Sequence, residues 1–151
     1  MSYVESVLQS GETVLARGRL HWIVFGRGVL FLLLAVVLLL LPVPVRWHGT
    51  VNWLAALSAL LALPFLVHGW YDQWITEMAV TSRRIIYKRG LIRRKTAEMN
   101  LDKVESVNVS QSILGRIFDY GTIDVRGTGG GIEGVRSVAE PLRFRSAITA
   151  R

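Results

Sequence analysis

The stretch that decides the fold spans residues 28–71 and reads GVLFLLLAVVLLLLPVPVRWHGTVNWLAALSALLALPFLVHGWY. It contains two apolar runs, 29–45 and 51–71, and neither run contains Lys, Arg, Asp or Glu. A helix needs about 20 apolar residues to cross a bilayer core about 30 Å thick, so the second run is long enough and the first lies near the lower limit. Because residues 29–41 are apolar on every helical face, the pattern favours a transmembrane helical hairpin over the buried hairpin of a soluble protein.

The charges that flank the two runs predict a topology. The net charge is +7, and it is unevenly placed: Arg17, Arg19 and Arg27 precede the first run, Arg46 lies between the runs, and the other Lys and Arg follow the second run. Lys and Arg in short loops stay on the cytoplasmic side of a membrane. Both ends of the chain are therefore expected in the cytoplasm, with residues 46–50 outside.

The tryptophans follow the ends of the apolar runs. An indole ring is apolar with one polar N–H group, so it favours the headgroup layer of a bilayer. A soluble core would not distribute its tryptophans in this way. The expected membrane-interface anchors are Trp22, Trp47, Trp53, Trp70 and Trp74.

The rest of the chain divides into a cytoplasmic segment before the hairpin, 1–27, and one small cytoplasmic domain after it, 72–151. In the first segment, apolar residues at helical spacing over 3–8 are followed by an alternating, strand-like stretch at 13–20. A strand this short is unstable alone. It is expected to pair with the C-terminal domain, because the hairpin returns the chain to the same side of the membrane.

Short alternating segments replace the apolar runs after residue 72. Six strands separated by short turns are expected at 75–81, 82–88, 91–101, 104–109, 122–126 and 134–139. This pattern predicts an antiparallel meander that forms a sheet or a small barrel. Two helices are also expected: one over 111–118, capped by Ser110 and carrying an apolar face, and one over 142–150, opened by Pro141.

A basic cluster lies within residues 83–95, with no acidic residue between Glu77 and Glu98. It consists of Arg83, Arg84, Lys88, Arg89, Arg93, Arg94 and Lys95. The cluster is either a solvated hairpin or a surface for a partner or for anionic lipid headgroups, near which each cation is worth about 1 kcal/mol. Nucleic acid is a less favoured partner, because Tyr87 alone interleaves with the cations and stacking surfaces need more aromatic rings.

Signals for catalysis and cofactor binding are weak. Residues 129–134 match G-x-G-x-x-G, but the segment after them has a strand pattern instead of the helix that holds a pyrophosphate. A flexible loop at 127–131 is the preferred interpretation, and its role stays open. The chain has no Cys, and His21, His48 and His68 lack the spacing of metal ligands. We therefore expect no enzymatic activity, cofactor, metal site or small-molecule substrate.

Several segments together carry a family likeness. They are VTSRRIIYKRG at 80–90, EMNLDKVESV at 98–107, YGTIDV at 120–125 and EPLRFRSAI at 140–148. With the paired apolar runs and the upstream Gly11-Glu12, they resemble the membrane-anchored branch of the bacterial pleckstrin-homology (PH) domain family.

The resemblance implies an α+β protein of the bacterial inner membrane, in which a two-helix transmembrane hairpin accompanies a PH-like antiparallel β-barrel with a C-terminal helix. It also implies an interaction module with a suggested link to envelope stress, and it does not imply phosphoinositide binding. Eukaryotic relatives bind inositol phosphates through basic residues at the first strand–strand turn, and Arg83, Arg84, Lys88 and Arg89 lie near a comparable early turn.

Neither apolar run holds the buried charges of a transporter, so the hairpin is interpreted as an anchor. Two functions stay open for the protein. The first is a scaffold that binds an unidentified protein partner. It would form homo-oligomers through small residues of the second run, which are Ala55, Ala56, Ser58, Ala59 and Ala62. The second is a sensor of anionic headgroups that uses residues 83–95.

Overall fold

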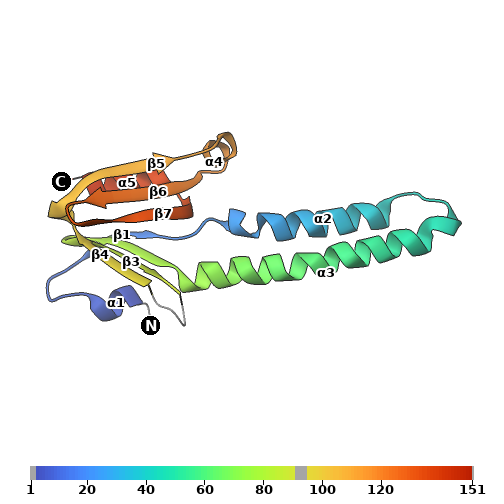
Figure 1. Ribbon diagram of the computed structural model, residues 1–151, viewed down its shortest axis with the longest axis horizontal. Helices are drawn as coiled ribbons and strands as arrows, with labels where there is room; N and C mark the ends of the chain where they lie inside the picture. Colours follow the sequence, from blue (N-terminus) through green and yellow to red (C-terminus); the bar gives the residue numbers. More distant parts are fainter. Residues whose placement is uncertain (1–2, 91–94, 151) are drawn as a thin grey trace. The chain divides into compact units, whose positions relative to one another are not determined.

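A computed structural model of the chain describes residues 3–90 and 95–150 (Figure 1). The chain forms two compact units, one from residues 1–21 and 73–151 and the other from residues 22–72. We call the first unit the domain and the second the hairpin. The hairpin is thus an insertion into the sequence of the domain. The N-terminal segment, which precedes the hairpin, is part of the domain.

The chain contains two long helices between β1 and β2, and mainly strands after them. The bounds of the helices and strands are α1 Tyr3–Val7, β1 Val14–Gly18, η1 Trp22–Phe25, α2 Gly26–Leu40, α3 Val45–Ile75, β2 Glu77–Thr81, β3 Arg84–Arg89, β4 Lys95–Asn100, η2 Leu101–Lys103, β5 Val104–Ser110, α4 Ile113–Ile117, β6 Tyr120–Gly127, β7 Gly130–Ala139 and α5 Pro141–Thr149.

The hairpin consists of two helices that are long and apolar enough to cross a membrane, over Trp22–Leu40 and Val45–Ile75. The sequence analysis placed the connection between them at residues 46–50, and this was wrong. The structure has the connection at 41–44, and α3 begins at Val45. The physical reason is that Pro44 fits directly before a first helical turn, whereas residues 46–50 contain no proline that would stop a helix.

Small residues bring the two helices of the hairpin together. Ala55, Ser58 and Ala62, spaced by three and four residues on α3, are all buried. The Ser58 hydroxyl donates a hydrogen bond of 2.8 Å to the Phe31 carbonyl of α2. Gly28 of α2 lies so close to Leu66 that a Cβ atom on it would approach the Leu66 side chain to 2.6 Å.

This packing changes the interpretation of the small-residue stripe. Ala55, Ser58 and Ala62 had been assigned to contacts between copies of the chain, but they are used inside the hairpin. Of the same stripe, Ala56 is exposed and Ala59 is half-buried. The stripe is therefore accounted for mainly by the hairpin's own helix–helix contact, which needs closely approaching backbones.

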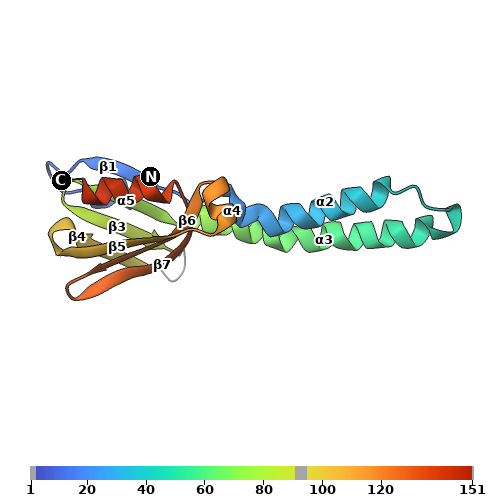
Figure 2. The same cartoon turned by 90° about the horizontal axis from the view of Figure 1, so that it is seen from above.

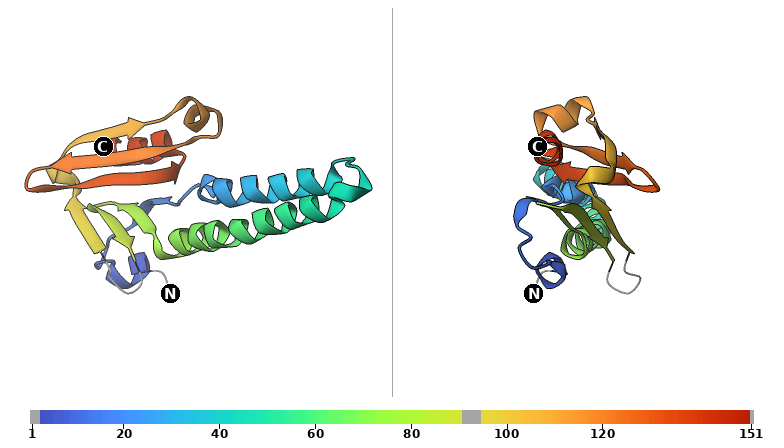
Figure 3. Two further views of the ribbon diagram at one scale, coloured as in Figure 1. Left: turned by 45° about the vertical axis from the view of Figure 1, so that its right-hand side comes forward. Right: turned by 90° about the vertical axis from the view of Figure 1, so that its left-hand side faces the viewer.

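In the described residues the strands of the domain form two antiparallel sheets instead of the single closed barrel that was expected (Figure 3). The first sheet has the order β1-β2-β3-β4, and the second has the order β5-β6-β7. β1 pairs with β2, with Gly18 opposite Met78. Beyond β1 the chain reaches the second sheet, where Leu20 forms a bridge with Val138.

The core of the domain lies between the two sheets. Its fully buried side chains include Val80 and Ile85 of the first sheet and Ile123 and Val138 of the second. The final helix α5 contacts strands of both sheets and runs alongside β1 (Figure 2), and its Phe144 is part of this core. The alternation of apolar residues along β4, β5 and β6 therefore predicts the inward face of these strands correctly.

A second, smaller cluster covers the outer face of the first sheet. There Val4 of α1 packs on Ala79 and Ile86, whose neighbours Val80 and Ile85 point into the main core. β2 and β3 are consequently buried on both faces. This explains why each of these strands has three consecutive apolar residues, at 78–80 and 85–87, instead of a strict alternation.

The packing of the hairpin generates a prediction. Replacing Ala62 with Leu is expected to destabilise the hairpin by about 1–3 kcal/mol, because Ala62 is fully buried and a larger side chain overpacks the contact. Thermal unfolding of the full-length protein in detergent micelles, followed by far-UV circular dichroism, measures the change. Ala56→Leu is the matched control, since Ala56 is exposed on the same helix. Equal melting temperatures for the two variants would contradict this packing.

Candidate functional site

The domain has two distinguishable ends. The chain leaves the domain after His21 and re-enters it at Gln73, and the Gln73 side-chain amide donates a hydrogen bond of 3.3 Å to the Leu20 carbonyl. We call this the connection end. At the opposite end lie the β2–β3 turn and the β6–β7 turn, because each strand that starts at the connection end finishes there.

The strand register divides the predicted basic cluster between these two ends. Lys88 lies opposite Glu77, the first residue of β2, and Arg89 lies opposite Lys95, so these cations are at the connection end. Arg83 and Arg84 are at the opposite end. Because β3 extends by about 3.3 Å per residue, the two groups of cations are about 16 Å apart. Arg93 and Arg94 lie outside the described residues.

The early turn that was compared with an inositol-phosphate site is not the first strand connection of the domain. Arg83 lies in the turn between β2 and β3, which is the second strand connection of the domain. The first connection, between β1 and β2, is the whole hairpin. The basic residues 83–89 therefore have no equivalence to a first strand–strand turn.

The cations at the connection end differ in their surroundings. The Lys88 ammonium group lies 3.3 Å from the Glu77 carboxylate and 5.2 Å from the centre of the Tyr3 ring, and its side chain is mostly buried. Arg89 and Lys95 are exposed. Arg89 and Lys95 are thus the exposed members of the predicted basic cluster at this end within the described residues.

Arg84 does not belong to an open surface, which corrects its prediction as a binding residue. Its Nε and Nη2 atoms donate hydrogen bonds of 3.1 and 3.0 Å to the two carboxylate oxygens of Glu12. Its other contacts are with the Glu98 carboxylate at 2.7 Å and the Val7 carbonyl at 2.8 Å. Arg84 therefore connects the N-terminal segment to β3 and β4.

Glu12 is the buried partner of this pair, and its side chain has no exposed surface. It also accepts hydrogen bonds from the Thr81 hydroxyl at 2.6 Å and the Gln9 backbone N–H at 2.9 Å. Burial raises the pKa of Glu12, but these hydrogen bonds and the Arg84 charge lower it more strongly, from 4.5 to about 2. The hydrogen bond to Glu12 raises the pKa of Arg84 against the effect of burial.

The tryptophans expected at a membrane interface are all exposed. They are Trp22 at the start of η1, Trp47 and Trp53 in the first turns of α3, and Trp70 and Trp74 in its last turns. The Arg46 guanidinium lies 5.8 Å from the ring centre of Trp47. An exposed indole near the end of an apolar helix is typical of a side chain placed in the headgroup layer.

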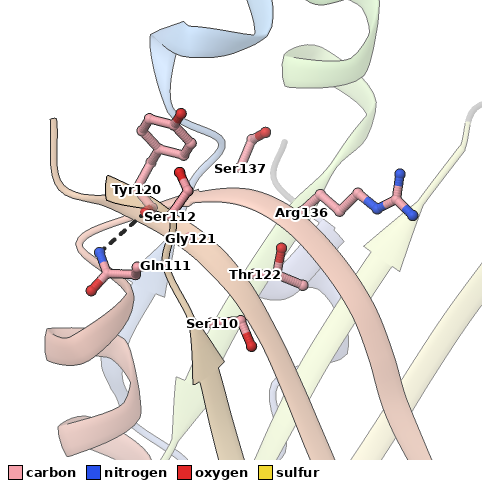
Figure 4. A pocket seen from close by; sticks show the side chains of 8 residues that line it. All are labelled: Ser110, Gln111, Ser112, Tyr120, Gly121, Thr122, Arg136 and Ser137. Carbon is pink, nitrogen blue, oxygen red and sulfur yellow. Dashed lines mark hydrogen bonds between the residues drawn. The ribbon is translucent and has the colours of Figure 1, made fainter. Parts of the chain in front are cut away.

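An open polar pocket of about 430 Å³ lies on the second sheet near the connection end (Figure 4). Its lining residues are Ser110, Gln111, Ser112, Tyr120, Gly121, Thr122, Arg136 and Ser137. They offer hydroxyl, amide and guanidinium donors and no carboxylate. The Gln111 amide is already used, since it donates to the Tyr120 carbonyl at 3.1 Å. The pocket therefore suits a small anionic or neutral polar group better than a cation.

The glycine-rich segment is structural. Gly127 ends β6 and pairs with Gly130, so the expected flexible loop is a short turn over Thr128 and Gly129. A Cβ atom on Gly127 would collide with the Lys103 carbonyl, to which the Thr128 N–H donates at 3.2 Å. Glycine is therefore required there by a close approach of two backbones.

Residues with catalytic potential are dispersed. Within residues 3–90 and 95–150, no group of three His, Cys, Asp or Glu side chains is placed to hold a metal ion. The exposed His68 ring lies 3.5 Å from the Asp72 carboxylate, a pair that the sequence analysis missed although the two residues are four apart on one helix.

The comparisons with known proteins agree with this description. A family model described as the bacterial PH domain matches residues 18–151, and this confirms the resemblance found in the sequence. The comparisons with curated proteins and with solved structures gave no match.

The Glu12–Arg84 pair generates a prediction about stability. Glu12→Gln is expected to lower the free energy of unfolding by about 3 kcal/mol, because it leaves the largely buried Arg84 charge without its main partner. In the unchanged protein, the contribution of Glu12 is present above about pH 4.5. It is lost as the pH falls toward about 2, because protonation removes a carboxylate whose folded pKa is depressed.

Denaturant unfolding of the full-length protein at a series of pH values measures both effects. Glu133→Gln is the control, since Glu133 forms an exposed pair with Arg126 at 3.6 Å and is expected to contribute less than about 1 kcal/mol. The proposed role of Glu12 would be refuted if the Glu12→Gln variant were as stable as the unchanged protein above pH 4.5, or if the difference in stability between the two did not shrink as the pH falls from 4.5 toward 2.

Proposed function

Because the chain belongs to the bacterial PH domain family, we propose that it is a non-enzymatic, multi-pass protein of the bacterial inner membrane whose domain contacts anionic lipid headgroups through its connection end. In this proposal the hairpin spans the membrane, and both chain termini and the domain are cytoplasmic. The observation that carries the proposal is that Arg89 and Lys95 lie at the end where the domain joins the hairpin.

The double connection supports this orientation. The chain passes from the domain into the hairpin directly after His21 and returns at Gln73. A domain joined to two adjacent spans by such short connections keeps its connection end close to the leaflet surface. A charge within about 8 Å of an anionic leaflet is little screened by physiological salt, and each Lys or Arg there contributes about 1 kcal/mol.

The composition of the hairpin supports an anchor instead of a transport path. Apart from Arg27, Arg46 and Asp72 near its ends, residues 22–72 contain no Lys, Arg, Asp or Glu. Transporters place ionisable side chains at membrane depth, facing a cavity or a partner helix. The small-residue contact between α2 and α3 is the packing expected of two helices in lipid.

A protein-interaction function is a second candidate, favoured by the opposite end of the domain. A wide hollow of about 720 Å³ lies there. Leu15, which lines it, is 57% exposed, and Arg83 next to it is exposed as well. If the connection end is occupied by lipid, this hollow is the surface presented to a cytoplasmic protein, which is how the chain would act as a scaffold.

The lipid proposal predicts a difference between two cysteine positions, which the cysteine-free chain makes simple to test. Thr96→Cys at the connection end and Thr128→Cys at the opposite end are both exposed sites. Each is labelled with a fluorophore in the full-length protein, reconstituted into vesicles that contain a headgroup quencher. Quenching is expected at position 96 in phosphatidylglycerol vesicles, and it is expected to weaken in phosphatidylcholine or at high salt, because charge attraction drives the contact.

The fluorophore at position 128 is expected to stay unquenched in every lipid. A fluorophore at Thr50→Cys marks the outer side of the hairpin. In the Thr96→Cys background, Arg89→Gln with Lys95→Gln is expected to reduce quenching, whereas Arg126→Gln is not. Equal quenching at positions 96 and 128 would overturn the proposal.

The scaffold candidate predicts proximity labelling at the opposite end. A photocrosslinking amino acid at Arg83 is expected to capture a cytoplasmic protein in living cells as a discrete adduct identified by mass spectrometry. The same amino acid at Arg143, an exposed position near the start of α5 and away from this hollow, serves as the control. Identical adducts from both positions would indicate non-specific capture and would count against this second function.

A further inference from the structure

The short helix α4 is oriented in the opposite way from an ordinary amphipathic helix. Its glycine, Gly115, is buried against the domain, while Ile113, Leu114 and Ile117 are 80%, 57% and 68% exposed. The sequence predicts that these residues form one apolar face of the helix. A helix at the surface of a soluble domain normally buries its apolar stripe and exposes its polar one.

Specific contacts hold α4 in this orientation. The Ser112 side chain caps the helix by accepting a 3.0 Å hydrogen bond from the Gly115 N–H. The Gln111 amide, labelled in Figure 4, donates to the Gly115 carbonyl at 3.2 Å and to the Tyr120 carbonyl at 3.1 Å. A Cβ atom at position 115 would approach the Tyr120 carbonyl to 2.6 Å. The backbone of α4 is therefore fixed with its glycine inward and its apolar side chains outward.

The position of α4 in the domain is equally well defined. Tyr120, the first residue of β6, follows α4 after two residues and pairs with Ala139. The Tyr120 ring stacks on the His21 ring at 5.4 Å, and burial lowers the pKa of His21, which keeps that ring neutral near pH 7. His21 is the last residue before the chain leaves the domain. α4 consequently lies at the connection end.

We propose that α4 is an interfacial anchor, which inserts Ile113, Leu114 and Ile117 into the boundary between headgroups and acyl chains of the leaflet that the connection end faces. This inference rests on the proposed membrane orientation and deepens it. Arg116, exposed on the same helix, lies at the depth of the anionic headgroups when its neighbours are inserted. An apolar helical face flanked by a cation is the pattern of helices that lie in the plane of a membrane surface.

The bilayer suits this face better than a second copy of the chain does. A standard protein–protein interface covers roughly 800 Å² on each partner, and a five-residue helix offers far less. Insertion into lipid has no such minimum, because each apolar side chain gains separately from leaving water. The position at the connection end, continuous with the apolar hairpin along the chain, also assigns the face to lipid.

The test compares two leucines of equal exposure in the full-length, cysteine-free protein. Leu114→Cys on α4 and Leu15→Cys at the opposite end replace side chains that are both 57% exposed. Each carries a polarity-sensitive fluorophore in phosphatidylglycerol–phosphatidylcholine vesicles with or without lipids brominated high on the acyl chains. We expect blue-shifted emission and quenching by brominated lipids at position 114, and aqueous emission without quenching at position 15.

Additional variants separate insertion from other causes. Ile117→Glu in the Leu114→Cys background is expected to abolish the quenching, whereas Ile117→Leu is expected to retain it, and both changes are at an exposed site that leaves the core intact. Blue-shifted emission at position 114 that depends on the protein-to-lipid ratio and is not quenched by bromine would identify a second copy of the chain and overturn the inference.

Failure of α4 to insert is distinguishable from failure of the proposed function. If position 96 is quenched at the headgroups and position 114 remains in water, the domain contacts lipid and α4 does not insert. If neither position senses lipid, the proposed orientation of the domain fails together with the inference.

Discussion

The buried ion pair between Glu12 and Arg84 is the interaction on which the geometry of the domain depends. Glu12 precedes β1 by two residues, and Arg84 begins β3, so the pair fixes β1 beside β2 at the edge of the first sheet. β1 in turn leads directly into the hairpin. The pair therefore orders the segment through which the chain passes into β1 and then toward the hairpin.

A buried pair of this kind is weak evidence for stability in itself, because removing both charges from water is costly. Its value here is specificity. The Glu12 carboxylate accepts from two sites on Arg84, one on Thr81 and one on Gln9, so only one arrangement of the N-terminal segment satisfies it. Gly11, with φ of +77°, supplies the turn that directs Glu12 inward. The family match starts at residue 18, and the structure extends the domain to the segment before it.

Local patterns made much of the fold predictable, and long-range contacts limited the rest. Apolar runs and strand alternation depend on neighbouring residues, so the two long helices, the antiparallel strands and the final helix could be inferred from the sequence. The burial of Arg84 could not be inferred from the sequence, because its partner Glu12 lies 72 residues away and no residue near position 84 indicates the pairing. The division of the basic cluster likewise follows from the length and direction of β3. The outward face of α4 follows from Gly115, whose need for a close approach to Tyr120 appears only in three dimensions.

In the proposed function, the insertion of the hairpin into the domain would allow weak lipid contacts to be sufficient. A soluble domain that binds a membrane must offset the loss of translational and rotational freedom, which costs at least about 4 kcal/mol. In the proposed orientation, the two covalent connections would keep Arg89, Lys95 and α4 near the leaflet, and the effective concentration of headgroups would already be high. A few contacts of about 1 kcal/mol each would then determine the orientation of the domain. Its location at the membrane would be determined by the covalent connections. In the proposed function, a change in lipid charge would therefore control the orientation of the domain and, with it, the exposure of the hollow at the opposite end.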